Sequence, residues 1–412
     1  MTDRTDPPPK RHLGSQLDNT ITQNILIAAL GLVGLGNIVI PPSAPTLLHS
    51  IYLPISLVVI ATIVAIGSTT IAQTIKQPFT IGLFCLSVVP GFLIAPLEEY
   101  GRTKLLAMAI AVLLIIAPHL LGQREEAFSR LFMLIFSISA IMATVALIVS
   151  DTDSSGRLQA FGINPIPSGR LFGLAPLIAI AYMLGQNRPK ISLSVLITLA
   201  SGAGVVALVL TGSRGPLISL VAAVAVICIV RLHSLLHRPV FTILGITAVT
   251  VGIYLAFETT NQPSRITSAS SSGRDLLYQE SLRLVSSNPL GVGWGNLGSN
   301  LPPMGLGNRE TLYAHNILLE IAAEAGWIAV IAFVLLICGA AINSVRAIRG
   351  GSTSAVMTLA LLVFAVTGAL FSSDVVGSRL MWLSIGLALA HNHGGDHSTE
   401  PAVVHSPGER SE

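Results

Sequence analysis

The chain has 412 residues, of which 52% are hydrophobic and only 10% are charged, and its mean hydropathy is +0.74. Charged residues make up about a quarter of a typical soluble globular domain, so this composition excludes that class. The formal net charge of +3 says little by itself, and we expect no nucleic-acid partner. Apolar runs of about 20 residues, each long enough to cross a bilayer, recur along the chain. The sequence therefore predicts an all-α integral membrane protein.

Taken in order, the apolar segments predict about twelve transmembrane helices. They lie near residues 21–40, 51–71, 79–97, 104–121, 131–150, 168–185, 191–210, 215–232, 240–257, 316–342, 353–371 and 375–390. This pattern predicts a cytoplasmic tail (1–20), spans 1–9 (21–257), an extracytoplasmic loop with a short amphipathic helix (258–314), spans 10–12 (315–392) and a second cytoplasmic tail (393–412).

The orientation follows from the preference of lysine and arginine for cytoplasmic loops. With the amino terminus inside, thirteen of the 23 basic residues fall in inside segments and ten in outside segments. Four of those ten lie in the single long loop, where the preference has little weight. Both termini are therefore expected in the cytoplasm. The same topology brings Arg157, Arg214, Arg274 and His315 to the outer face, where an anionic ligand would account for them.

The first polar motif is TGSRGP, Thr211 to Pro216. Gly212 and Gly215 permit a tight turn, and Pro216 suits the first turn of the next helix. Arg214 lies at the membrane boundary, where a guanidinium is costly unless it is paired or faces an aqueous cavity. A snorkelling arginine on a short loop is the alternative interpretation.

The long loop contains two further motifs. The spacing of apolar residues in SSGRDLLYQESLRLVSSNP predicts a short amphipathic helix on the outer membrane surface, with Arg274 in its first turn. A surface helix with solvated charges is the alternative. The following GVGWGNLG contains a G-x-G-x-x-G match, but no strand precedes it, so we interpret it as a glycine-rich turn that allows close backbone packing.

The loop ends at His315 and Asn316, which open a new apolar helix. Glu320 and Glu324 are four residues apart and so share one face of that helix. An ionisable cluster at the end of a membrane helix is a candidate functional site. A histidine at a helix start can instead be a cap or a packed residue, and either glutamate could serve as a base in its place.

The sequence also lacks several motifs. No G-x-x-x-x-G-K-[ST] loop occurs, so the chain does not use ATP directly. No H-E-x-x-H motif, Cys/His cluster or paired acidic motif occurs in the outer loops, so we expect neither a metal nor a cofactor.

Three of these segments, TGSRGP, SGRDLLYQESLRLVSSNPLGVGWGN and HNILLEIAAEAGWIAV, together resemble the O-antigen ligase and polymerase superfamily. The resemblance extends from about Arg157 to Leu336 and includes GRLQAFGINPIPSG, which is similar to the family's loop before its sixth span. Two positions depart from the ligase pattern: Tyr278 replaces a leucine, and Ala329 replaces glycine, threonine or valine. These departures leave ligase and polymerase open.

The resemblance implies metal-independent, inverting transfer of a glycan from a polyprenyl-diphosphate carrier to a hydroxyl of a lipid, protein or glycan acceptor. It also implies a multi-pass protein of the bacterial cytoplasmic (inner) membrane, in contact with membrane lipids, with its site facing outward. By position, Arg214 and Arg274 would bind the diphosphate and His315 would act on the acceptor hydroxyl. The same expectation includes Arg157, Asn316 and Glu324 as substrate-binding residues.

Two other functions stay open at this point. A polymerase of lipid-linked repeat units would use the same motifs. A transporter of an anionic solute would use the arginines as an anion pathway, but the internal repeat common in transporters is absent, because the long loop occurs once.

Overall fold

The computed structural model describes residues 20–35, 46–66, 78–96, 99–121, 125–150, 152, 156–160, 164–185, 191–231, 274–303 and 312–391. Regular structure in these ranges is helical, with one isolated bridge between Thr152 and Leu158. The prediction of an all-α fold is therefore confirmed. The predicted ninth span at 240–257, residues 1–19 and 392–412, and part of the long loop lie outside the described residues.

Ten of the elements in the described ranges precede residue 232. They are α1 (Thr20–Leu35), α2 (Thr46–Ile66), α4 (Pro78–Val88), α5 (Pro90–Leu93), α6 (Glu99–Ile116), the 3-10 helix η3 (Ala117–Leu121), α7 (Glu125–Val149), α8 (Pro165–Gly185), α9 (Ile191–Leu210) and α10 (Arg214–Val230). The described helices after it are α14 (Arg274–Ser287), α15 (Leu297–Asn300), α16 (Ile317–Arg349), α17 (Thr353–Ser372) and α18 (Arg379–Ala390).

Five of the described segments are long and apolar enough to cross a membrane: Glu99–Leu121, Glu125–Val149, Pro165–Gly185, Ile317–Arg349 and Thr353–Ser372. The other apolar helices are shorter, and α18 has only 12 residues. The protein is thus a multi-pass membrane protein, and the total of twelve spans stays a prediction.

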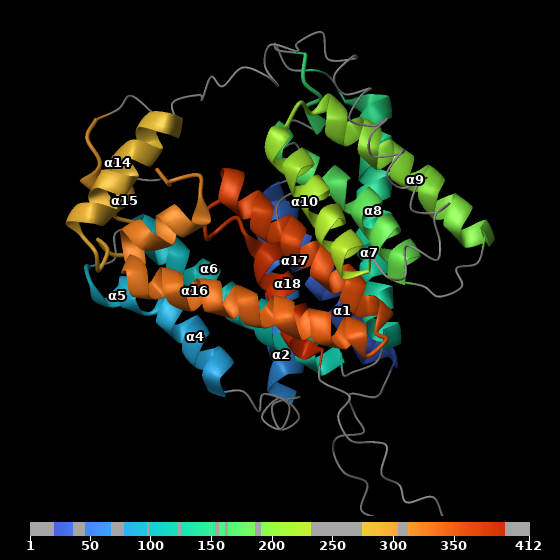
Figure 1. Cartoon of the computed structure of the whole chain (residues 1–412), viewed down its shortest axis with the longest axis horizontal. Coiled ribbons are helices and arrows are strands. Elements are labelled where there is room, and N and C mark those ends of the chain that lie inside the picture. Colours follow the sequence, from blue (N-terminus) through green and yellow to red (C-terminus); the bar gives the residue numbers. More distant parts are fainter. Residues whose placement is uncertain are drawn as a thin grey trace, which may run out of the picture.

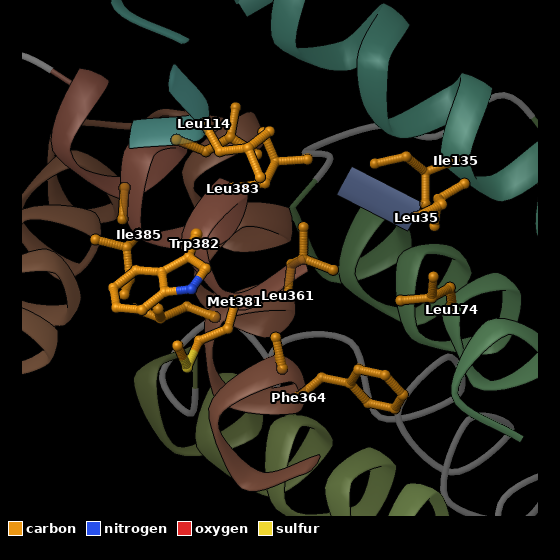
Figure 2. Close-up of a cluster of buried hydrophobic side chains, with 14 of the residues drawn as sticks. Leu35, Leu114, Ile135, Leu174, Leu361, Phe364, Met381, Trp382, Leu383 and Ile385 are labelled. Atoms are coloured by element: carbon orange, nitrogen blue, oxygen red, sulfur yellow. The ribbon is translucent and has the colours of Figure 1, made fainter. Parts of the chain in front are cut away.

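Helices α17 and α18 lie at the centre of the bundle (Figure 1). Figure 2 shows Trp382 of α18 and Phe364 of α17 among buried side chains of α1, α6, α7 and α8. Because lipid is as apolar as leucine, close packing between helices has to supply their attraction. Glycines make this packing possible: a Cβ atom at Gly386 would lie 2.4 Å from the carbonyl oxygen of Leu114.

Side-chain contacts show which helix ends lie together. At one end of the bundle, Gly185 at the end of α8 accepts hydrogen bonds from Arg231, which follows α10, and from Thr353 at the start of α17. There, too, the amide of Ser354 donates to Glu125 at the start of α7. Helices α8 and α10 therefore finish where α7 and α17 begin.

The opposite end holds the starts of α10 and α16 and the end of α17. A Cβ atom at Gly215 would lie 3.3 Å from the Cβ of Phe371 in α17. Four residues beyond Phe371, the amide of Val375 donates to Glu320 of α16 at 3.0 Å. We call this the site end, defined by residues 99–104, 211–215, 312–324 and 371–379.

Candidate functional site

The TGSRGP segment forms the tight turn that its glycines predict. Gly212 has φ +57°, in the left-handed region that glycine tolerates best. Ser213 is extended, and α10 begins at Arg214, with Pro216 in its first turn as predicted. This turn places Arg214 at the boundary of an apolar helix.

Arg157 supports this turn from a distant part of the sequence. Its Nε donates to the carbonyl of Thr211 at 2.8 Å, and a terminal nitrogen donates to Oγ of Ser213 at 3.0 Å. The side chain of Arg214 is exposed, and no residue in the described part of the chain forms a hydrogen bond or ion pair with it. Arg157 is therefore committed to backbone support, while Arg214 is available to a ligand.

The predicted amphipathic helix is α14, which starts at Arg274 and ends at Ser287, just before Asn288 and Pro289. It lies beside the first half of α16 (Figure 1). Its apolar face, with Leu277 and Val285 fully buried, packs there against Ala322 and Ala323. Its placement relative to the membrane surface stays a prediction.

Helix α14 reaches the segment that holds His315. The hydroxyl of Tyr278 donates to the carbonyl of His315 at 3.4 Å. Arg274 is one turn earlier on α14. The structure thus brings the start of α14 next to the start of α16.

His315 has an unusual backbone conformation. Its φ is +53°, the one positive φ at a non-glycine residue in the described ranges. Its ring contacts the ring of Tyr313 in a tilted arrangement, with a centroid distance of 4.2 Å and an interplanar angle of 52°. Asn316 then caps α16, because its side-chain oxygen accepts from the amides of Leu318 and Leu319. The predicted helix opening is confirmed, with Asn316 as the cap and His315 immediately outside it.

Helix α16 is interrupted nine residues after it starts. Gly326 has φ +84° and ψ 175°, which is not helical. The glycine-rich loop fills the break: Val292 and Gly293 donate to the carbonyls of Ala323 and Glu324 at 2.9 Å, and Trp327 donates to Pro289. Residues 317–325 therefore form a separate half-helix. The carbonyl groups at its end, which lack helical partners, accept hydrogen bonds from the loop.

The glycines of this loop allow the close packing that the sequence predicts. Gly291, Gly293 and Gly295 all have φ between +85° and +92°. A Cβ atom at Gly291 would lie 2.6 Å from the backbone of Glu324, and one at Gly295 would lie 2.4 Å from the backbone amide of Gly101 in α6. The loop is thereby wedged between α6 and the half-helix.

Glu320 and Glu324 form an ionic cluster with a lysine that the sequence analysis missed. Lys104 of α6 is fully buried, and its Nζ donates to Oε1 of Glu320 at 2.6 Å and to Oε2 of Glu324 at 2.5 Å. The two glutamates do share one helix face, as predicted. The sequence gives no sign of the role of Lys104, because its partners lie more than 200 residues further along the chain.

The candidate residues therefore fall into three groups at the site end. Arg157 contacts the turn that carries Arg214, and the start of α14 contacts the His315 segment through Tyr278. Glu324 is fully buried in the ionic cluster. The segment from Phe371 to Val375 connects the first group to the other two, since it packs on Gly215 and binds Glu320.

These features define an all-helical, multi-pass membrane protein with arginines and a histidine gathered at one end of the bundle. A family model described as O-antigen ligase matches residues 199–334. The match includes Arg214, Arg274, His315 and the half-helix, and it confirms the resemblance to the O-antigen ligase and polymerase superfamily. Among curated proteins, none matches the chain.

Proposed function

We propose that this protein is a ligase that moves a glycan from a polyprenyl-diphosphate carrier to an acceptor hydroxyl at the outer face of the membrane. The observation that carries the proposal is the gathering of Arg214, exposed and without a described partner, and His315 at one end of the bundle. Both residues, with Arg274, lie inside the matched family region. The outward orientation rests on the charge distribution of the short loops.

In the proposed reaction, the acceptor oxygen attacks C1 of the donor sugar. Its proton passes to the imidazole of His315 as the new C–O bond forms. The bond between C1 and the phosphate oxygen breaks, and its electron pair leaves with the diphosphate. The guanidinium groups of Arg214 and Arg274 bind the diphosphate oxygens and offset this growing negative charge. Attack opposite the leaving group inverts the anomeric centre, and no metal takes part.

The other predicted site residues have supporting roles in this proposal. Arg157 holds the turn that presents Arg214, and Asn316 fixes the start of α16 beside His315. The carboxylate of Glu324 is bonded to Lys104 and to the amide of Leu297. Because Glu324 is buried and both of its oxygens are occupied, we assign it to support of α16 and keep His315 as the base.

The test of this function is transfer by the purified protein in lipid nanodiscs. The donor is a polyprenyl-diphosphate oligosaccharide, and the candidate acceptors are a glycolipid, a protein and a second copy of the donor. A glycan attached to the glycolipid or protein supports the ligase. Extension of the lipid-linked glycan indicates the polymerase, and movement of intact donor or solute without a new glycosidic bond contradicts both.

The arginine pair gives a prediction of its own. Arg214→Lys and Arg274→Lys should each reduce turnover and leave expression intact, because lysine provides a point charge and not a planar pair of donors. Loss of one charge-assisted hydrogen bond, worth about 1.5–3 kcal/mol, corresponds to a decrease of about tenfold to a hundredfold. Arg102→Lys is the matched control, since Arg102 is exposed near the same end of the bundle. Wild-type turnover in both site variants would exclude the diphosphate clamp.

A further inference from the structure

The structure assigns a role to Lys104 that the proposed function does not include: we infer that Lys104 is a positioning residue, which holds the half-helix 317–325 and thereby sets the place of His315. The inference rests on the proposed function for its catalytic consequence. Its structural part, the clamping of the half-helix, can be tested without any activity.

The first step in the argument is the number of segments that meet at Lys104. Glu320 accepts from Lys104 with one oxygen and from the amide of Val375 with the other, at 3.0 Å. Glu324 likewise accepts from Lys104 and, at 3.2 Å, from the amide of Leu297 at the start of α15. A single ammonium group thus connects α6, both turns of the half-helix, α15 and the segment before α18.

A second contact links α6 to the segment before α18. Tyr100 lies one turn before Lys104 on α6, and its hydroxyl donates to Oδ2 of Asp374 at 2.9 Å. The Nζ of Lys104 also lies 4.8 Å from the centroid of the Tyr100 ring and 5.6 Å from that of Trp294. The ammonium group is therefore surrounded by carboxylates and aromatic faces, with its side chain fully buried.

The charges in the cluster explain why the lysine is required. Two carboxylates buried together repel each other, and burial makes each of them costly unless a cation and hydrogen-bond donors compensate. Lys104 is the cation between them, and the amides of Val375 and Leu297 supply the remaining donors. Without Lys104, the two carboxylates would be buried without their cation, and the ion pairs that tie both turns of the half-helix to α6 would be lost.

The half-helix depends on this clamp because it lacks helical continuity with the rest of α16. The break at Gly326 separates it from residues 327–349, so a long rigid helix does not fix its direction. His315 immediately precedes the half-helix, with Asn316 as the cap. A shift of the half-helix therefore moves the imidazole relative to Arg214, and a displacement of about 1 Å can cost a hundredfold in rate.

The experiment compares three variants in the full-length protein. Lys104→Met leaves both carboxylates without their cation. The triple variant Lys104→Met, Glu320→Gln, Glu324→Gln removes the unpaired charges but keeps amide oxygens for Val375 and Leu297, so it should fold even where the single variant does not. Arg102→Gln, an exposed neutralisation two residues away on α6, is the control.

We expect the triple variant to bind the lipid-linked donor with unchanged affinity and to lose about tenfold to a hundredfold in kcat. Amide hydrogen exchange should rise in residues 315–325 and stay at the wild-type level in α17. Arg102→Gln should change neither readout. Wild-type kcat together with wild-type exchange in the triple variant would overturn the role of Lys104. If the wild-type protein transfers no glycan, the proposed function fails, and the exchange measurement still decides on the clamp.

Discussion

The backbone of His315 determines how its role should be tested. At φ +53°, a residue lies in the left-handed region, which asparagine and glycine tolerate better than alanine. Replacement by alanine would therefore combine loss of the imidazole with backbone strain. Asparagine keeps the local conformation and a polar side chain and removes the base.

We accordingly predict that His315→Asn binds the lipid-linked donor normally and transfers it about a hundredfold to ten-thousandfold more slowly. The measurements are donor binding and single-turnover transfer in nanodiscs. His315→Gly, which also accepts a positive φ, serves as a second variant that should behave in the same way. Transfer near the wild-type rate in either variant would make His315 a structural residue and return the question to the glutamates.

At the scale of single residues, the sequence predicts arrangements that depend only on residues a few positions apart. Glu320 and Glu324 are one helical turn apart, so their shared face follows from spacing alone. The same reasoning predicts the turn at Gly212 and the helix opening at Asn316. Lys104 could not be found in this way, because its ion pairs arise only when α6 and α16 pack together. The roles of Arg214, Arg274 and His315 stay predictions.

Helix α16 shows how an element can depend on a loop. At Gly326 the chain leaves helical geometry, and a Cβ atom there would lie 2.5 Å from the carbonyl oxygen of Leu290. Gly339 in the same helix has open space at its Cβ position. The two glycines therefore make a matched pair for substitution.

We predict that Gly326→Ala lowers the free energy of unfolding by about 1–3 kcal/mol, because it adds backbone strain and a clash with the loop. Gly339→Ala should be neutral or slightly stabilising, since alanine favours helix more than glycine does. Thermal unfolding of the purified variants in detergent checks both. Equal melting temperatures for the two variants would mean that the break at Gly326 does not depend on glycine.

The positions of helices could be predicted where one hydrophobic pattern continues along the whole segment. The apolar runs locate the membrane helices, and the amphipathic pattern locates α14 within a few residues. The break in α16 was not predictable, because ILLEIAAEAGWIAV (residues 317–330) is a good helical sequence and a single glycine, Gly326, does not by itself indicate an interruption. The division into α4 and α5 at Val89 and Pro90 similarly occurs inside an apolar run that hydropathy alone treats as one span.

At the scale of the whole molecule, the bundle has two distinct ends, and the charge distribution predicts which one faces out. Ser299 is exposed in α15 at the site end, and Arg349 is exposed at the far end of α16. In a variant lacking Cys85, Cys228 and Cys338, we predict that Ser299→Cys reacts with a membrane-impermeant thiol reagent in intact cells and that Arg349→Cys does not. The opposite labelling pattern would reverse the topology and place the site in the cytoplasm.

For the whole molecule, the sequence predicts the all-α class and the polar loop segments. Hydropathy makes this possible, because apolar segments prefer lipid or the protein interior and polar segments prefer water. It does not predict the packing order, in which α17 and α18 occupy the centre, since every apolar span has similar composition. The contacts described above place the ends of α8 and α10 with the starts of α7 and α17, and the starts of α10 and α16 with the end of α17. The number of spans and the boundaries of the loop stay predictions.

The pairing of Lys104 has a consequence for biosynthesis. Lys104 leaves the ribosome 216 residues before Glu320 and 220 before Glu324, so α6 enters the membrane before its acidic partners exist. An uncompensated lysine costs about 2.5–3.5 kcal/mol at the centre of a membrane helix, but near a helix end it can extend toward the interface. Lys104 is near the start of α6. The first helices can therefore insert with the lysine directed to the aqueous boundary, and the site can close only after α16 has been synthesised.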